Sequence, residues 1–135
     1  MSDFIAIETL INDYFQALHH KDVAKIETIF WDHASITGYY EGEFVHSKLH
    51  DYLSILKRMS APNMIGEDFD MEVVSIELKG NMAAVKTRYL FQALEYVDFL
   101  SLLKIHYFYF LKNQLLNLSL FEFHELIETF SLLIQ

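Results

Sequence analysis

The chain has 135 residues, which suits one domain whose single core buries roughly two thirds of the unfolded surface. Its 53% hydrophobic content excludes a disordered chain, and its formal net charge of -9 disfavours a phosphate backbone as partner, so we expect no nucleic-acid binding. The absence of cysteine excludes disulfides, thiolate metal ligands and thiol nucleophiles.

The N-terminal ten residues carry an acid where a secretory leader would be basic. No window of about 20 residues is free of charged or strongly polar groups, as a membrane-spanning helix would need to be. We therefore expect a cytoplasmic protein with no membrane partner.

Helices are expected in three places. Asp3 can cap a first helix with one apolar face, formed by Phe4, Ile7, Leu10, Ile11, Tyr14, Phe15 and Leu18. Asp22 can cap a short second helix. Ser47 can cap a third helix, whose inward residues would be Leu49, Tyr52, Leu53 and Leu56.

Short strands are expected between the second and third helices, at 34–40 and 44–46, joined by a turn at 41–43. Residues 72–79 alternate and predict a further strand. The Gly80-Asn81 pair suits a two-residue hairpin turn, because Gly readily takes the positive φ that such turns require.

Residues 82–105 form the longest block of alternating side chains. From 82 to 93 the odd positions share one face, and the charged Lys86 and Arg88 fall on the other. After a break at 92–96, a second strand is expected, with its odd positions facing the same interior as the odd positions of the first strand. Asp98 would then face outward, within reach of Lys86 or Arg88.

The tail after residue 105 has a different pattern. Residues 107–111 could prolong the strand, 112–114 could turn, and Leu116, Leu118 and Leu120 alternate as a last strand would. Beyond it, apolar residues follow helical spacing and predict an amphipathic helix. We therefore divide the chain into a domain at 1–121 and a C-terminal tail at 122–135.

The element order, helices and short strands before a run of long strands, argues for an α+β domain. Several features recur in a known superfamily: Tyr14-Phe15-x-Ala17-Leu18 with Asp22, Ile29-Phe30 followed by Ala34, Gly42, the helix from Ser47, Gly80-Asn81-Met82-Ala83, and 98–104. Through them the chain resembles the nuclear transport factor 2-like superfamily, and within it the "putative lumazine-binding" (SnoaL-like) group. The resemblance implies a cone-shaped, curved, mixed or antiparallel sheet wrapped around three N-terminal helices, with a possible extra C-terminal helix.

The resemblance also implies an apolar pocket between the concave face of the sheet and the first and third helices. The side chains expected to line it are Tyr14, Phe15, Tyr52, Leu56, Val85, Thr87, Tyr89, Phe91, Phe99, Ser101 and Leu103. Aromatic residues at regular spacing also simply fill cores, and that alternative stays open.

Relatives that isomerise ketosteroids use a carboxylate base, a Tyr and a neutral Asp. Tyr14 matches the Tyr, but Gly38 stands where the base is expected and Ser101 where the neutral Asp is expected. Steroid-type isomerisation is therefore not expected. Asp32-His33 is the leading substitute for acid–base chemistry, since a His beside a carboxylate can titrate near neutral pH; both can equally be surface groups.

Three functions remain open. The chain can be a small-molecule-binding protein with an apolar cone pocket, a cofactor-free SnoaL-like enzyme of proton-transfer type (isomerase, dehydratase or cyclase) that uses Tyr14, Asp32 and His33, or a protein-interaction module whose pocket is filled. We expect a small apolar or aromatic ligand, no cofactor and no metal, since the seven histidines do not share a helical face. A homodimer through the sheet is also expected, because Leu90, Leu100 and Leu102 would be apolar outer positions.

Overall fold

The computed structural model describes residues 2–105 and 108–118, with side chains as far as Lys104. In chain order the elements are α1 (Asp3–His20), α2 (Val23–Ile29), β1 (Phe30–Tyr40), β2 (Glu43–Lys48), α3 (Leu49–Arg58), the short 3-10 helix η1 (Pro62–Ile65), β3 (Met71–Lys79), β4 (Met82–Phe91), β5 (Leu94–Ile105) and β6 (Phe108–Leu118).

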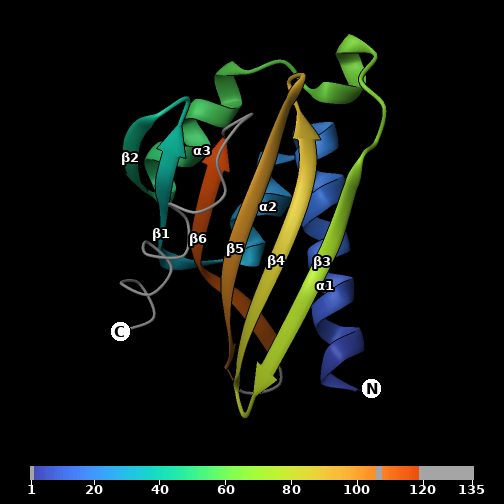
Figure 1. The fold of residues 1–135 in the computed structure, drawn as a ribbon, viewed down its shortest axis with the longest axis vertical. Coiled ribbons are helices and arrows are strands. Elements are labelled where there is room, and N and C mark those ends of the chain that lie inside the picture. The colour runs from blue at the N-terminus through green and yellow to red at the C-terminus, as the bar shows by residue number, and fades with distance from the viewer. Residues whose placement is uncertain (1, 106–107, 119–135) are drawn as a thin grey trace.

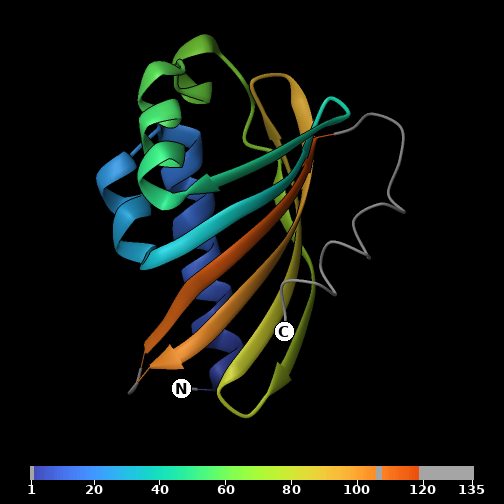
Figure 2. The same ribbon diagram turned by 90° about the vertical axis from the view of Figure 1, so that its left-hand side faces the viewer.

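The strands form one six-stranded sheet in the order β2-β1-β6-β5-β4-β3. The β1–β6 pair is parallel and all other pairs are antiparallel, so the sheet is mixed. Figures 1 and 2 show the strands twisting and curving together, with the three helices on one face. This confirms the predicted α+β class and the sheet around three helices. The predicted C-terminal helix and the 122–135 tail lie outside the described residues.

The helix starts differ in part from the predictions. The first cap is Ser2, whose hydroxyl accepts from the Ile5 N–H (3.2 Å), whereas Asp3 stands in the first turn and pairs with Lys104. Asp22 caps α2 as predicted, accepting from the Lys25 N–H. Ser47 caps nothing, because β2 continues to Lys48 and α3 begins only after it.

The core lies between the helices and the inner face of the sheet, which is the face that the helices cover. α1 contributes Ile7, Ile11, Tyr14, Phe15 and Leu18; α3 contributes Leu49, Leu53 and Leu56; and β4 contributes Ala83, Val85, Tyr89 and Phe91. The three- and four-residue spacing of the two helices and the odd positions of β4 thus predicted these buried faces correctly, except that Phe4, which was assigned to the apolar face of α1, is 48% exposed.

The inward face of β5 was predicted wrongly. The β4–β5 turn consists of only Gln92 and Ala93, so Phe91 pairs with Leu94 and Val85 pairs with Leu100. Since paired residues share a face, the even positions of β5 point inward. Leu100 and Leu102 are therefore core residues, 0% and 1% exposed, and cannot form an outer dimer surface.

The end of the sheet also differs from the prediction. β1 begins at Phe30 rather than at residue 34, directly after α2. The turn predicted at 112–114 is absent: β6 runs through it, and the pairing with β5 shifts register so that Ser101 pairs with Asn113 and Leu102 with Leu111. This shift leaves Lys112 as an extra residue, as in a β-bulge.

Candidate functional site

A cross-strand row through the middle of the sheet contains two polar side chains. Thr87 of β4 pairs with Asp98 of β5, and Asp98 pairs on its other side with Leu116 of β6. Leu116 pairs in turn with Gly38 of β1. Thr87 and Asp98 are both 0% exposed, so two polar side chains occupy the centre of the core.

Asp98 is held by a tyrosine from the neighbouring strand. The Tyr89 hydroxyl donates to Asp98 Oδ2 at 2.7 Å, and Tyr89 itself is 3% exposed. Both side chains belong to the inner face, since Tyr89 and Tyr96 pair two positions along from Thr87 and Asp98. The carboxyl group is thus held inside the core by a hydroxyl of the neighbouring strand.

Two further hydroxyls approach from the helices. Tyr14 of α1 and Tyr52 of α3 lie 3.3 Å apart, hydroxyl to hydroxyl. The Tyr14 ring contacts Phe30 edge-on, with centroids 5.7 Å apart, and Phe30 also contacts Tyr52. The first residue of β1 therefore packs against both helical tyrosines.

Electrostatics links these groups into one cluster. Burial raises the pKa of Tyr89 well above its ordinary value, and the negative charge of Asp98 raises it further. Burial also raises the pKa of Tyr52; its hydrogen bond with Tyr14 opposes this shift and the charge of Asp98 adds to it. Both tyrosines are therefore neutral hydroxyls at neutral pH. We call Tyr14, Tyr52, Thr87, Tyr89 and Asp98 the interior polar cluster.

Aromatic rings surround the cluster towards the β4–β5 turn. Tyr89 and Tyr96 stack with an interplanar angle of 7° and centroids 5.1 Å apart. Phe91 meets Tyr96 edge-on, and Phe15 packs against Tyr89 from α1. Burial raises the pKa of Tyr96 as well, and the negative charge of Asp98 raises it further.

Most of the residues predicted to line the pocket do face the interior. Those turned inward are Tyr14, Phe15, Tyr52, Leu56, Val85, Thr87, Tyr89 and Phe91. Phe99, Ser101 and Leu103 were predicted wrongly: they stand on the opposite face of β5 and are only partly buried. There the Lys86 ammonium lies 5.8 Å from the centroid of the Phe99 ring.

Asp98 is the residue that sequence reasoning missed. It was predicted to face outward and to pair with Lys86 or Arg88, yet it is buried, and Arg88 pairs with Asp70 and Glu72 instead. A two-residue turn at Gln92 would have given the right face, but no Gly, Asn or Asp marks that turn. Ser101, which had been assigned the place of the neutral Asp, lies outside.

The predicted catalytic residues are not brought together. Tyr14 is fully buried, whereas Asp32 and His33 are exposed on the first part of β1. The His33 ring contacts Trp31 edge-on, with centroids 4.9 Å apart. Acid–base chemistry by Asp32 and His33 on a ligand inside the core has no support from this arrangement.

Within the part of the chain that the structure describes, no group of three or more His, Asp or Glu side chains is placed to hold a metal ion. Over the same residues, no helix is both long and apolar enough to cross a bilayer.

The family model described as "Putative lumazine-binding" matches residues 2–107, so the chain belongs to this family. No curated protein matches the sequence significantly. The chain is also similar in structure to proteins described as NTF2-like and of unknown function. The protein from Silicibacter pomeroyi has a TM-score of 0.73 at 19% identity, and the match covers 86% of this chain and 95% of that one. The protein from Shewanella baltica has a TM-score of 0.75 at 14% identity, with 87% and 94% covered. The protein from Methylobacillus flagellatus has a TM-score of 0.71 at 18% identity, with 87% and 92% covered. At this identity the likeness shows the fold, and the NTF2-like superfamily assignment made from the sequence is confirmed.

Proposed function

We propose that the protein binds a small, flat heteroaromatic molecule between α1, α3 and the inner face of the sheet. The observation that carries this proposal is the interior polar cluster, in which a fully buried carboxyl group and tyrosine hydroxyls are enclosed by aromatic rings. Binding sites for small molecules combine a mostly apolar lining with a few convergent polar groups.

A carboxyl group in an apolar core is costly, which supports a functional role. Burial of a polar or ionisable group costs free energy unless hydrogen bonds or charges compensate it. Leucine would fill this position of a strand without that cost, as Leu100 does one inward position away. The cluster thus lowers folding stability in exchange for polar atoms inside the core.

The family description favours one ligand class. Lumazine is a bicyclic ring with carbonyl oxygens and ring N–H groups along its edges. The hydroxyls of Tyr14 and Tyr52 can donate to such carbonyls, and Asp98 can accept from a ring N–H. The stacked pair Tyr89 and Tyr96 presents flat apolar surface of the kind that a bicyclic ring packs against.

The experiment is a fluorescence titration of lumazine against four purified proteins: wild type, Asp98→Asn, Tyr14→Phe and the control Asp32→Asn. Asn keeps the shape of Asp98 and still accepts from Tyr89 but loses the charge. We expect Asp98→Asn to weaken binding by about 10- to 100-fold, because a hydrogen bond to a charged group becomes one to a neutral group. Tyr14→Phe should weaken binding less.

The control variant is chosen because its side chain is exposed to solvent. Asp32 lies on the surface, so its variant should bind as wild type does. Equal losses in Asp98→Asn and Asp32→Asn would contradict the proposed site. No saturable binding by wild type at millimolar lumazine would contradict the ligand class and favour an interaction module with a filled interior.

A second candidate, a proton-transfer enzyme, is favoured by the inward position of Asp98. With Tyr14 it supplies two of the three groups that a ketosteroid isomerase uses, rather than the one expected from the sequence. The missing base would stand at Gly38, which belongs to the same cross-strand row. The test follows the conversion of a β,γ-unsaturated ketone to its conjugated isomer by the rise in absorbance. A rate no higher than that in buffer alone would exclude this activity for that substrate.

A further inference from the structure

The connecting segment, residues 60–70, joins α3 to β3 and passes the end of the sheet where β4 turns into β5 (Figure 1). It is tied to that turn by side chains from both sides. The Glu67 carboxylate accepts from the backbone N–H groups of Gln92 (3.0 Å) and Ala93. The Gln92 side-chain amide donates in return to the carbonyl of Ser60.

The turn depends on this contact for its conformation. Gln92 and Ala93 have φ of 57° and 64°, in the left-handed region that residues with a Cβ disfavour. Two successive N–H groups converging on one anion form a favourable site for negative charge. Glu67 therefore stabilises a turn that its own residues disfavour.

The connecting segment is fixed at both ends and lightly packed between them. Before it, Lys21 donates to the carbonyls of Lys57 and Met59. At its end, the Asp70 carbonyl accepts from the Leu90 N–H at 2.8 Å. Between these anchors Met64 is 80% exposed and Ile65 is 53% exposed, although both are apolar.

The part of the sheet beneath this turn leads to the interior polar cluster. Phe91 and Leu94 flank the turn, the next inward pair is Tyr89 and Tyr96, and Asp98 follows. Ala61 and Pro62, at the start of the connecting segment, are themselves buried. Moving the segment would uncover this end of the core.

We propose that the connecting segment is a lid over the aromatic end of the interior, and that Glu67 and Gln92 form its latch. The role as a ligand gate rests on the proposed function, since it requires a ligand to reach the interior polar cluster. Ligand entry and release then need the latch to break, while the anchors at Met59 and Asp70 stay in place.

The lack of cysteine allows a clean test. Glu67→Cys together with Ala93→Cys places two thiols at the latch, where the Glu67 carboxylate accepts from the Ala93 N–H, and oxidation locks the lid. Lumazine association is measured by stopped-flow fluorescence for oxidised and reduced samples of the same protein. We expect oxidation to slow association at least about tenfold and reduction to restore it, as for a gating segment that must open. The control pair Lys79→Cys and Met82→Cys cross-links the β3–β4 hairpin and should change nothing.

Hydrogen exchange supplies a readout that needs no ligand. In Glu67→Ala, the amides of Gln92 and Ala93 should exchange at least about tenfold faster than in wild type, while the β4 core amides stay unchanged. Glu72→Ala, which removes an exposed carboxylate that does not contact the turn, is the control. Equal association rates in a fully cross-linked sample, or unchanged exchange at Gln92 and Ala93, would overturn the lid. Absence of lumazine binding in wild type would instead remove the proposed function, and exchange would still decide whether the segment opens.

Discussion

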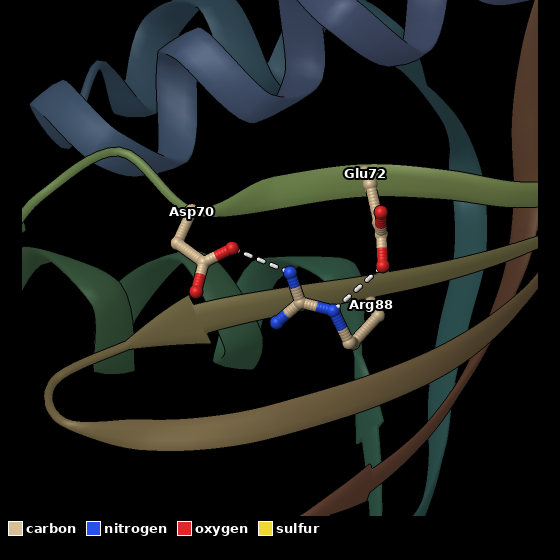
Figure 3. A network of polar contacts seen from close by, with 3 residues as sticks. All are labelled: Asp70, Glu72 and Arg88. Atoms are coloured by element: carbon tan, nitrogen blue, oxygen red, sulfur yellow. Dashed lines mark hydrogen bonds and ion pairs between the residues drawn. The ribbon is translucent and has the colours of Figure 1, made fainter.

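Arg88 and Tyr89 are consecutive residues of β4, and each contacts carboxylate groups in a very different environment. On the outer face Arg88 pairs with Asp70 at 2.5 Å and with Glu72 at 2.9 Å, as Figure 3 shows. On the inner face Tyr89 donates to Asp98 at 2.7 Å. The outer network has two ion pairs, whereas the inner contact is a hydrogen bond from a neutral hydroxyl, yet we expect the inner contact to matter more.

The difference comes from water. The Asp70 and Glu72 side chains are 53% and 60% exposed, so solvent competes for their hydrogen bonds and screens their charges. Asp98 is fully buried, and any partner that it loses cannot be replaced by bulk water. The degree of burial therefore predicts the contribution of these contacts to stability better than their number or their formal charge does.

The largest expected effect is alkaline destabilisation by the buried tyrosines. Burial raises the pKa values of Tyr89, Tyr52 and Tyr96 above the unfolded value of 10.0. Their contribution to stability is therefore complete below pH 10 and is lost as the pH rises above it, because the unfolded chain releases these protons first. By pH 11 each should cost about 1.4 kcal/mol, or roughly 4 kcal/mol for the three.

Urea unfolding at pH 8, 10 and 11 measures this loss. Tyr89→Phe should reduce the loss between pH 8 and 11 by about one third, since one of three titrating groups is removed. Tyr39→Phe, at a partly exposed position, serves as the matched control. A free energy of unfolding that stays constant up to pH 11 would contradict the burial of the cluster.

The next effect is the loss of the buried hydrogen bond at neutral pH. Tyr89→Phe keeps the ring and removes the donor to Asp98, so it should lower the free energy of unfolding by about 2–3 kcal/mol. The double variant Tyr89→Phe/Asp98→Leu should recover at least about 1 kcal/mol, because it removes the buried carboxyl group that Tyr89→Phe alone deprives of this donor. If the double variant is less stable than Tyr89→Phe alone, Asp98 supports the fold and not only a ligand.

The two turns next to β4 show what the sequence could and could not predict. Gly80-Asn81 was recognised as a hairpin turn because Gly tolerates positive φ, and the 57° at Gly80 agrees. Gln92-Ala93 adopts positive φ at both residues without any such residue type. Its conformation is supported by Glu67, which lies 25 residues earlier in the chain. No local pattern contains that information.

The error at this turn explains the error at the candidate site. In β4 the charges Lys86 and Arg88 mark the outer face, so its inward residues were predicted correctly. β5 has apolar residues at both odd and even positions from Val97 to Leu103, so alternation could not choose a face. The turn length decided it: the predicted break at 92–96 is three residues longer than the Gln92-Ala93 turn, and this odd difference moved Asp98 from the interior to the surface. Tyr14 and Tyr52 were placed correctly because helical spacing does not depend on a neighbouring strand.

The smallest expected effect concerns the outer network. Glu72→Gln removes one of the two charges that face Arg88 and should lower the free energy of unfolding by about 0.2–1 kcal/mol at low salt. In 1 M NaCl the difference from wild type should vanish, because the Debye length falls to about 3 Å. The effect of Tyr89→Phe should persist at the same salt concentration, since water and ions do not reach Asp98. Urea unfolding of both variants at two salt concentrations separates the contribution of the outer face of β4 from that of the inner face. If the effect of Tyr89→Phe disappears in salt, Asp98 is accessible to solvent and the contrast between the two faces is false.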